Sequence, residues 1–411
     1  MVEVWLPYGG SEIPARLPAE RLLDILRPEI PPSNESYLAD ATSALEKNDQ
    51  LVAAASEAKQ TCVALGTSGK PEPTLAIIHM LLEFLAKRSK GNVVILRSQD
   101  SPKIDQNTPV HGGVVDHDSH SSLTIEVQTS APFPMHLNSI FVNSDLKIAV
   151  GELKPHNLLK FEGLTDIILP GLASSATIRS HLSDRVGLKL EDLYKERAEV
   201  GNTIPNLFVL GYTLPDGINP ADITCGRFQE SLMALEGSVH DRFTKSFTKK
   251  ADIVVIGAGG TPNDATLSRA IEALPAGLSA LKKNGSLIFA AECENGHGNG
   301  EFYEWSAEGK EARYLEARIH RRLNYNGLKA SLLRRALDAH RIYLVSTLPD
   351  HYVESIFRMR ASRSISAALQ TVQRVQGSES SISIVPNGSR LIAEFIEPQK
   401  TESFQEQAQP R

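Results

Sequence analysis

Short runs of Val, Ile and Leu alternate with longer segments of helical periodicity along most of the chain. The runs are TCVALGT, NVVILRS, LKIAVGEL, NLFVLGY, ADIVVIGAGG, GSLIFAAE and RIYLVST. Apolar runs of this length, each followed by a helix, are typical of parallel strands that are covered on both faces. The segment after Pro73 predicts one such helix, because its apolar residues have helical spacing, at Leu75, Ile78, Leu82 and Leu85. The predicted fold class is therefore α/β.

The length of 411 residues and a restart of the strand pattern predict two domains. A long polar helical segment, FQESLMALEGSVHDRFTKSFTKK, precedes ADIVVIGAGG. We expect residues 1–246 to form an N-terminal domain and residues 247–398 a C-terminal domain, each with a mainly parallel sheet and flanking helices. The active-site cleft is expected between them. The polar segment 399–411 is expected to be a disordered tail.

Composition narrows the function classes. The net charge is −6 and basic residues are scattered, which argues against a nucleic-acid surface. No stretch reaches the roughly 18 apolar residues that a membrane span needs, and the N-terminus lacks the pattern of a signal peptide. Cys62, Cys225 and Cys293 include no C-x-x-C pair, so neither a disulfide framework nor a cysteine zinc site is expected. These features predict a soluble cytoplasmic protein.

Two loops that follow predicted strands in the N-terminal half carry candidate chemistry. In GTSGKPEPT, Lys70 could hold a carboxylate or phosphate, or it could be a solvated lysine in a turn. In VHGGVVDHDSH, His117 and His120 lie close to carboxylates that could orient their imidazoles. These histidines could transfer protons, bind a metal, or belong to a polar surface loop.

Three further segments supply candidates from strand ends. His156 ends LKIAVGELKPH, where catalytic bases lie in parallel folds, although a packing histidine is the alternative. The turn GAGGTPND, with Gly259, Gly260 and Asp264, suits an anion or cofactor and is also common in structural loops. His297, in AAECENGHGNG, could have a catalytic role or a purely structural one.

In order along the chain, these segments resemble one family. The matches are LPYG, KPEP, HD at His117, PH at His156, LPG, GGTPND, GHG, FYEW and IYLVS. Together they resemble the lactate racemase family that uses a nickel-pincer nucleotide. The resemblance implies a two-domain isomerase, a racemase or epimerase of a small hydroxy acid, in which His156 is a proton-transfer histidine.

The sequence also departs from the family pattern. Asp166 stands where the family has the lysine that tethers the cofactor, and an aspartate cannot form that link. His181 lies one position before the place of the family's next histidine, and Arg269 and Glu272 replace a glutamine and a lysine. Lys160 is an alternative tether. We therefore expect no metal and no covalent cofactor, while a nickel-pincer nucleotide held in another way stays open.

The resulting prediction is an isomerase-like enzyme that works by histidine proton transfer. His156 is the leading base, with His117 and His120 as partners, and replacement of His156 by Asn is expected to lower turnover by about 10²-fold. Lys70, Arg269 and His297 are expected to bind a small-molecule substrate, and a homo-oligomer is compatible with the sequence. The alternatives are a cofactor-independent lyase or cyclase of specialised metabolism on the same fold, and a non-catalytic binding protein.

Overall fold

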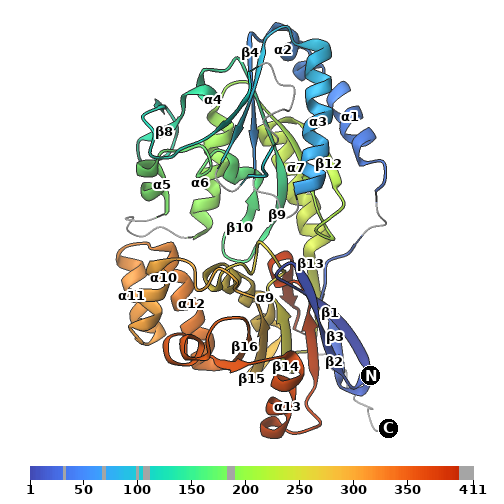
Figure 1. The fold of residues 1–411 in the computed structure, drawn as a ribbon, viewed down its shortest axis with the longest axis vertical. Helices are drawn as coiled ribbons and strands as arrows, with labels where there is room; N and C mark the ends of the chain where they lie inside the picture. Colours follow the sequence, from blue (N-terminus) through green and yellow to red (C-terminus); the bar gives the residue numbers. More distant parts are fainter. Residues whose placement is uncertain (31–33, 67–70, 99–100, 105–111, 183–189, 398–411) are drawn as a thin grey trace, which may run out of the picture.

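The computed structural model describes residues 1–30, 34–66, 71–98, 101–104, 112–182 and 190–397. Figure 1 shows two α/β units stacked along the long axis of the molecule. Lys70 and the segment 399–411 lie outside the described residues. No helix within the described ranges combines the length and the apolar character that crossing a membrane requires.

The first sheet has the strand order β12-β11-β9-β4-β5-β6, with β10 paired to β9. Its inner pairs are parallel, whereas β12 and β10 are antiparallel to their neighbours. The predicted runs form β4 (Gln60–Leu65), β5 (Asn92–Arg97), β9 (Leu146–His156) and β11 (Leu207–Thr213). The sheet is completed by β6 (Val114–Asp116), β10 (Lys160–Gly163) and β12 (Ala221–Arg227). The strands β9 and β11 are buried along their whole length, as continuous apolar runs predict.

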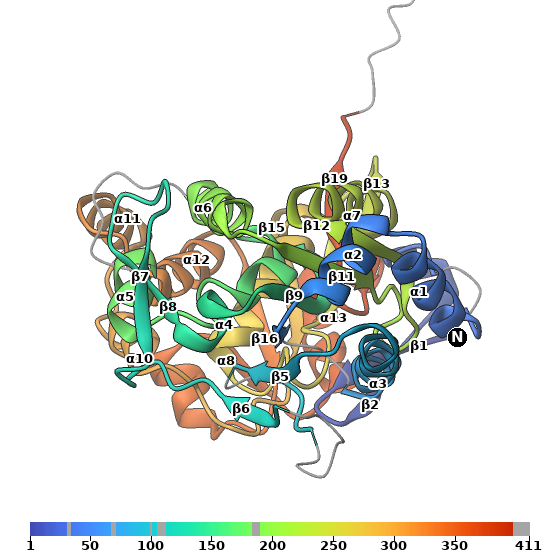
Figure 2. The same cartoon turned by 90° about the horizontal axis from the view of Figure 1, so that it is seen from above.

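Helices cover both faces of this sheet. Alternate residues of β9 belong to different cores: Ile148 packs with α1 (Tyr37–Glu46), α2 (Asp49–Glu57) and α3 (Pro71–Arg88), and Ala149 packs on the opposite face. The opposite face carries α4 (Ser139–Asn143), α5 (Ser175–Leu182), α6 (Leu190–Thr203), α7 (Phe228–Phe243), the 3-10 turn η2 (Leu164–Ile167) and the hairpin of β7 (Thr124–Val127) and β8 (Met135–Asn138). Figure 2 shows α1 to α3 grouped on one side, away from α4 to α6.

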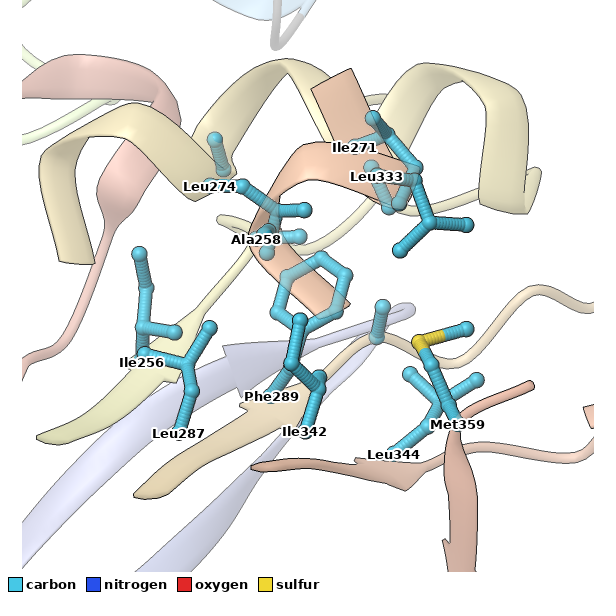
Figure 3. Close-up of a cluster of buried hydrophobic side chains, with 14 of the residues drawn as sticks. Ile256, Ala258, Ile271, Leu274, Leu287, Phe289, Leu333, Ile342, Leu344 and Met359 are labelled. Carbon is cyan, nitrogen blue, oxygen red and sulfur yellow. The ribbon is translucent and has the colours of Figure 1, made fainter. Parts of the chain in front are cut away.

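The second sheet is parallel throughout, with the order β17-β16-β15-β14-β18-β3. Its strands are β14 (Ala251–Gly257), β15 (Leu281–Ala290), β16 (Arg341–Val345), β17 (Arg360–Ser362), β18 (Ile382–Val385) and β3 (Leu22–Ile25). Figure 3 shows one face of its core, where Phe289, Leu287 and Ile256 project from the sheet toward Leu274 and Leu333. The α/β class with mainly parallel sheets in two domains is confirmed.

Helices of different lengths surround the second sheet. They are α8 (Leu267–Ala270), α9 (Leu274–Ser279), α10 (Gly300–Ala307), α11 (Ala312–Arg321), α12 (Tyr325–Ala339), α13 (Ile365–Gln376), the π-helical turn η4 (Tyr352–Ile356), and the 3-10 turns η1 (Ala19–Arg21), η3 (Ile271–Ala273) and η5 (Gly388–Arg390). Both α8 and η3 follow β14, so they begin at the carboxyl end of a parallel strand and lie near the first unit.

The first residues of the chain pack on the second unit. The hairpin of β1 (Val2–Tyr8) and β2 (Ser11–Leu17) shares a core with β14, and β3 adds the edge strand of that sheet. A further parallel pair is formed by β13 (Thr244–Phe247) and β19 (Ile392–Phe395). It lies where the chain passes from the first unit back to the second. The chain therefore starts in the C-terminal unit, while the boundary at residues 246 and 247 stays a prediction.

Candidate active site

A polar cavity of about 790 Å³, here called the main cavity, lies at the carboxyl ends of β5 and β6. Most of its wall comes from the first unit, and α8 of the second unit contributes Arg269. The lining residues are Arg97, Ser98, Asp116, His117, Asp118, Ser119, His120, Glu162, Asp166, Ile167, Pro170, Gly171, Ile178 and Arg269. Strand-to-helix loops converge at such an edge, which is where ligands of open α/β sheets bind.

The two predicted histidines of this wall differ in exposure and in how many of their ring nitrogens are hydrogen-bonded. His117 is held at both ring nitrogens: Asn138 donates to Nδ1 at 3.1 Å, and Nε2 donates to the Ala173 carbonyl at 3.0 Å. His120 is 81% exposed and contacts Ser119 through Nδ1 at 3.3 Å. Its Nε2 makes no hydrogen bond to any described residue. His120 therefore offers the more available imidazole.

The two arginines of the wall differ in the same way. Arg97 is committed to Asp116, with Nη2 at 2.5 Å from Oδ1, and it also donates to the Pro102 carbonyl. Arg269 is half-buried and forms no ion pair or side-chain hydrogen bond with the described residues. Its charge helps to lower the pKa of Glu162, which lines the same cavity. A guanidinium that is not held in an ion pair at a cavity wall is suited to bind a carboxylate.

His156 ends β9 at the junction of the two units and is almost fully buried. Its Nδ1 accepts backbone N–H bonds from Leu158 at 3.0 Å and Leu159 at 3.1 Å. Its Nε2 faces Glu272 of the second unit at 3.2 Å. A neutral ring with its proton on Nε2 satisfies all of these contacts.

The ionisation of His156 is set by opposing influences. Burial disfavours the imidazolium, but the carboxylates of Glu162 and Glu272 outweigh it and raise the pKa of His156. The two amide donors oppose that change, because a proton on Nδ1 would point at them. The net direction of the pKa change remains upward, and the neutral form of the ring keeps its proton on Nε2, facing Glu272.

His156 belongs to a buried set of charges between the units, here called the interface network. Its members are Lys154, His156, Glu162, Glu272, Tyr325 and Lys329. Lys154 pairs with Glu162 at 2.8 Å, and Lys329 pairs with Glu272 at 2.5 Å. Burial alone would raise the pKa of Glu162, but Lys154 and then His156 lower it to about 2. Glu272 is likewise held well below its usual pKa, because Lys329 and His156 outweigh its burial.

A second buried pair joins the same strand to the other unit. Glu152 of β9 binds Arg390 of η5, at 2.5 Å from Nη1 and 3.2 Å from Nη2. Their side chains are 1% and 5% exposed. Glu152, Lys154 and His156 alternate along β9, so all three point to one face of the strand, toward the second unit. This period-2 run of polar residues in a buried strand was the signal that could have revealed the interface.

Asp166, at the position expected for the family's tether, lies in a closed chain of contacts. Arg197 donates to Oδ1 at 2.6 Å, and Gly163 N–H donates to Oδ2 at 3.1 Å. Arg197 Nε also donates to His181 Nε2 at 3.0 Å, and His181 Nδ1 lies 3.0 Å from Glu196. The lone pair of His181 is thus directed at Arg197.

These residues do not fit a tethered nickel-pincer nucleotide. Asp166 supplies no amine, Arg197 fills the space at its carboxylate, and the nitrogens of His181 are engaged within the protein. Lys160 is exposed and lies over the Phe161 ring at 5.0 Å, away from the main cavity lining. Across the described ranges, no group of three or more His, Cys, Asp or Glu residues is arranged to hold a metal ion.

The remaining predicted residues lie apart from the main cavity. Asp264 is buried, and its Oδ2 accepts the N–H groups of Gly9 at 2.8 Å and Glu292 at 3.2 Å. Gly259 and Gly260 have positive φ and lie against residues 387–389 and the β1-β2 turn, respectively. The turn therefore fastens the N-terminal hairpin, although its neighbour Asn263 contacts Lys154 at 3.4 Å.

His297 packs among aromatic rings of the second unit. Its ring centroid lies 4.8 Å from that of Tyr303, and Tyr352 and Phe357 are also close. Its Nδ1 is buried without a hydrogen-bond partner in the described residues. The fold thus brings His117, His120 and Arg269 to one cavity, sets His156 just behind its wall, and leaves His297 elsewhere.

The fold and the site define a two-domain α/β protein with a polar, histidine-lined cavity beside its domain junction. Two family models match the chain: the lactate racemase N-terminal domain over residues 8–186 and the lactate racemase C-terminal domain over residues 247–393. The chain therefore belongs to the lactate racemase family of isomerases.

Known relatives agree with this assignment. A lactate racemase of Thermoanaerobacterium thermosaccharolyticum is 26% identical, with 95% of this chain and 99% of the relative covered. A lactate racemase of Lactiplantibacillus plantarum is 23% identical over 62% of this chain and 63% of the relative. The solved lactate racemase apoprotein from T. thermosaccharolyticum has the same fold, with a TM-score of 0.81 at 24% identity, and covers 96% of this chain and 100% of that one.

Proposed function

We propose that this protein is a racemase or epimerase that moves a proton at the carbon next to the carboxylate of a small hydroxy acid or a related substrate. The observation that carries the proposal is the pairing, in one cavity of about 790 Å³, of an available imidazole and an uncommitted guanidinium, those of His120 and Arg269. An imidazole needs little tuning to act as a base near neutral pH.

In this proposal Arg269 binds the substrate carboxylate and His120 Nε2 takes the proton from the adjacent carbon. The electron pair left on carbon spreads into the carboxylate, where the guanidinium stabilises the added charge. Return of a proton to the opposite face, from water, gives the other configuration. His117 holds its loop against the cavity wall through Ala173 and Asn138.

His156 acts through another residue in this scheme. Its Nε2 lies 3.8 Å from Glu162, which lines the main cavity, so His156 positions that carboxylate from behind. Lys70 remains a proposed substrate-binding residue, on sequence grounds alone.

Deuterium exchange tests the proposal. The protein is incubated in D₂O with lactate, glycerate and malate, and loss of the proton signal next to the carboxylate is followed by NMR. Chiral chromatography then measures inversion. We expect exchange with inversion for one substrate, lowered about 10²-fold in His120→Asn. His79→Asn, which replaces an exposed histidine of α3, is the matched control.

Other outcomes would replace the proposal. Exchange accompanied by an olefinic product would support a cofactor-independent lyase or cyclase, because elimination uses the same carbanion. Saturable binding of a substrate without exchange would support a binding protein. Among these alternatives we favour the lyase. Asp166 is paired with Arg197 and cannot tether the cofactor that would accept a hydride, and a lyase needs no such cofactor.

We also propose that the protein carries no covalent nickel-pincer nucleotide. Intact-mass spectrometry, after production together with the cofactor-synthesis enzymes, should give the mass of the unmodified chain. An adduct on Lys160 or any other lysine would contradict this proposal. A cytoplasmic location is proposed too, supported by the free thiols of Cys62, Cys225 and Cys293.

A further inference from the structure

A second polar pocket, here called the arginine pocket, opens in the C-terminal unit where α12 ends and the strands β16 and β17 begin. Its volume is about 210 Å³, and its polar lining consists of Arg334, Asp338, His340, Arg341, Arg358 and Arg360. It lies at the amino ends of the parallel strands. The interface network contacts η3, which follows the carboxyl end of β14, so the two sites are at opposite edges of the sheet.

The charges of this pocket are not balanced by the protein. Arg334 pairs with Asp338 at 3.0 Å. Arg341, Arg358 and Arg360 form no ion pair with any residue of the described ranges, and all three are exposed. Gathering like charges in one small pocket is unfavourable, and it occurs here in a chain whose net charge is −6. An anionic ligand would offset that cost.

Buried polar atoms around the pocket also lack partners. Arg334 Nε and His340 Nδ1 are shielded from solvent, and neither has a hydrogen bond within the described residues. Buried polar groups are normally paired, so unpaired ones in a ligand-sized pocket indicate a missing partner.

We propose that the arginine pocket binds a phosphate group of a small molecule, independently of the main cavity. Guanidinium groups bind phosphate oxygens through paired N–H bonds, and several of them can engage one multiply charged group. The pocket has the size of one phosphate-bearing moiety. The single carboxylate in its lining is already paired with Arg334, so it does not repel the ligand strongly.

Calorimetric titration of the full-length protein with inorganic pyrophosphate, at constant ionic strength, tests this site. We expect saturable binding that is weakened at least tenfold in the double variant Arg341→Ala with Arg360→Ala. The matched control removes the same charge from exposed arginines of α11 and α13, as Arg313→Ala with Arg374→Ala, and should bind like the wild type. Should the double variant fail to fold by circular dichroism, Arg358→Ala serves in its place.

Each alternative result overturns the proposal. Absence of saturable binding, or equal weakening in both double variants, would mean that the arginines attract anions only through diffuse charge. Equal affinity for citrate would make the pocket a general polyanion site instead of a phosphate site. Binding of a nucleic-acid oligomer that pyrophosphate does not displace would make it part of a larger surface.

Discussion

The interface network and the main cavity are adjacent and contain the same kinds of side chain, but these side chains differ in burial and in pairing. Glu162 belongs to both. In the network every charge has a protein partner, and the His156 side chain is 4% exposed. In the cavity, the His120 side chain is 81% exposed, and Arg269 has no ion-pair partner among the described residues.

This difference in burial and hydrogen bonding indicates which histidine is available to transfer protons. A buried ring whose two nitrogens are satisfied is part of the framework, because its desolvation is compensated only while those contacts last. An exposed ring with a spare nitrogen can accept a proton at little structural cost. The same logic separates Arg390, which is committed to Glu152, from Arg269.

The largest expected effect comes from breaking a buried pair across the two units. Arg390→Ala leaves the Glu152 carboxylate buried without its partner, so we expect it to lower the free energy of unfolding by about 3–5 kcal/mol. Urea denaturation measures this change. Arg16→Ala, which breaks an exposed pair with Glu3, should cost less than about 1 kcal/mol. Similar costs for both variants would mean that the units are not held together by the buried pair.

The next test separates the two histidines directly. His156→Gln removes an acceptor of two amide N–H bonds and should lower the free energy of unfolding by about 2 kcal/mol. His120→Gln should leave the melting temperature unchanged and lower turnover about 10²-fold on a substrate found by exchange. Thermal melts and initial rates measure the two effects. If His156→Gln abolished turnover while remaining as stable as the wild type, the leading role would return to His156.

Much of the framework could be predicted from the sequence because it depends on local patterns. Continuous apolar runs defined the central strands, and the stripe after Pro73 packs as expected, with Ile78 and Leu85 buried. The end of β9 and the loop of His117 and His120 were also located, since strand ends follow from the same runs.

The partners of those residues could not be predicted. Arg390 is 238 positions from Glu152, and Glu272 meets His156 only because two units pack together. Arg197 reaches Asp166 from α6 across 31 positions. Long-range pairs of this kind depend on domain packing, and a sequence pattern carries no signal for it. The sequence showed that Asp166 stands in place of the family's tethering lysine, but it did not show the contacts that Asp166 makes.

Acid should weaken the interface network by protonating its two buried carboxylates. The pKa of Glu162 is lowered to about 2 in the folded protein, and that of Glu272 is also lowered, so both bind protons more weakly than in the unfolded chain. Their contribution is complete above the unfolded value of about 4.3 and is lost as the pH falls toward about 2. We expect each of the two carboxyl groups to contribute a loss of about 2 kcal/mol between pH 6 and pH 3, measured by urea denaturation.

A matched pair of variants assigns that loss. Glu162→Gln should flatten the pH dependence, because one of the two displaced carboxyl groups is gone. Glu316→Gln, at an exposed pair with Arg335, should keep the wild-type slope. An unchanged slope in Glu162→Gln would show that the acid sensitivity arises elsewhere.

The smallest expected effect concerns Lys160, which lies outside both regions. Its backbone has a φ of 76°, in the left-handed region that favours glycine, and its side chain contacts only the Phe161 ring at 5.0 Å among the described residues. Lys160→Gly relieves about 1 kcal/mol of strain and loses about 0.5 kcal/mol of cation–π attraction. Stability in urea should therefore stay within about 0.5 kcal/mol of the wild type, and exchange activity should be unchanged. A loss of activity without a loss of stability would instead make Lys160 an anchor for substrate or cofactor, and would move the chemistry out of the cavity that His120 and Arg269 define.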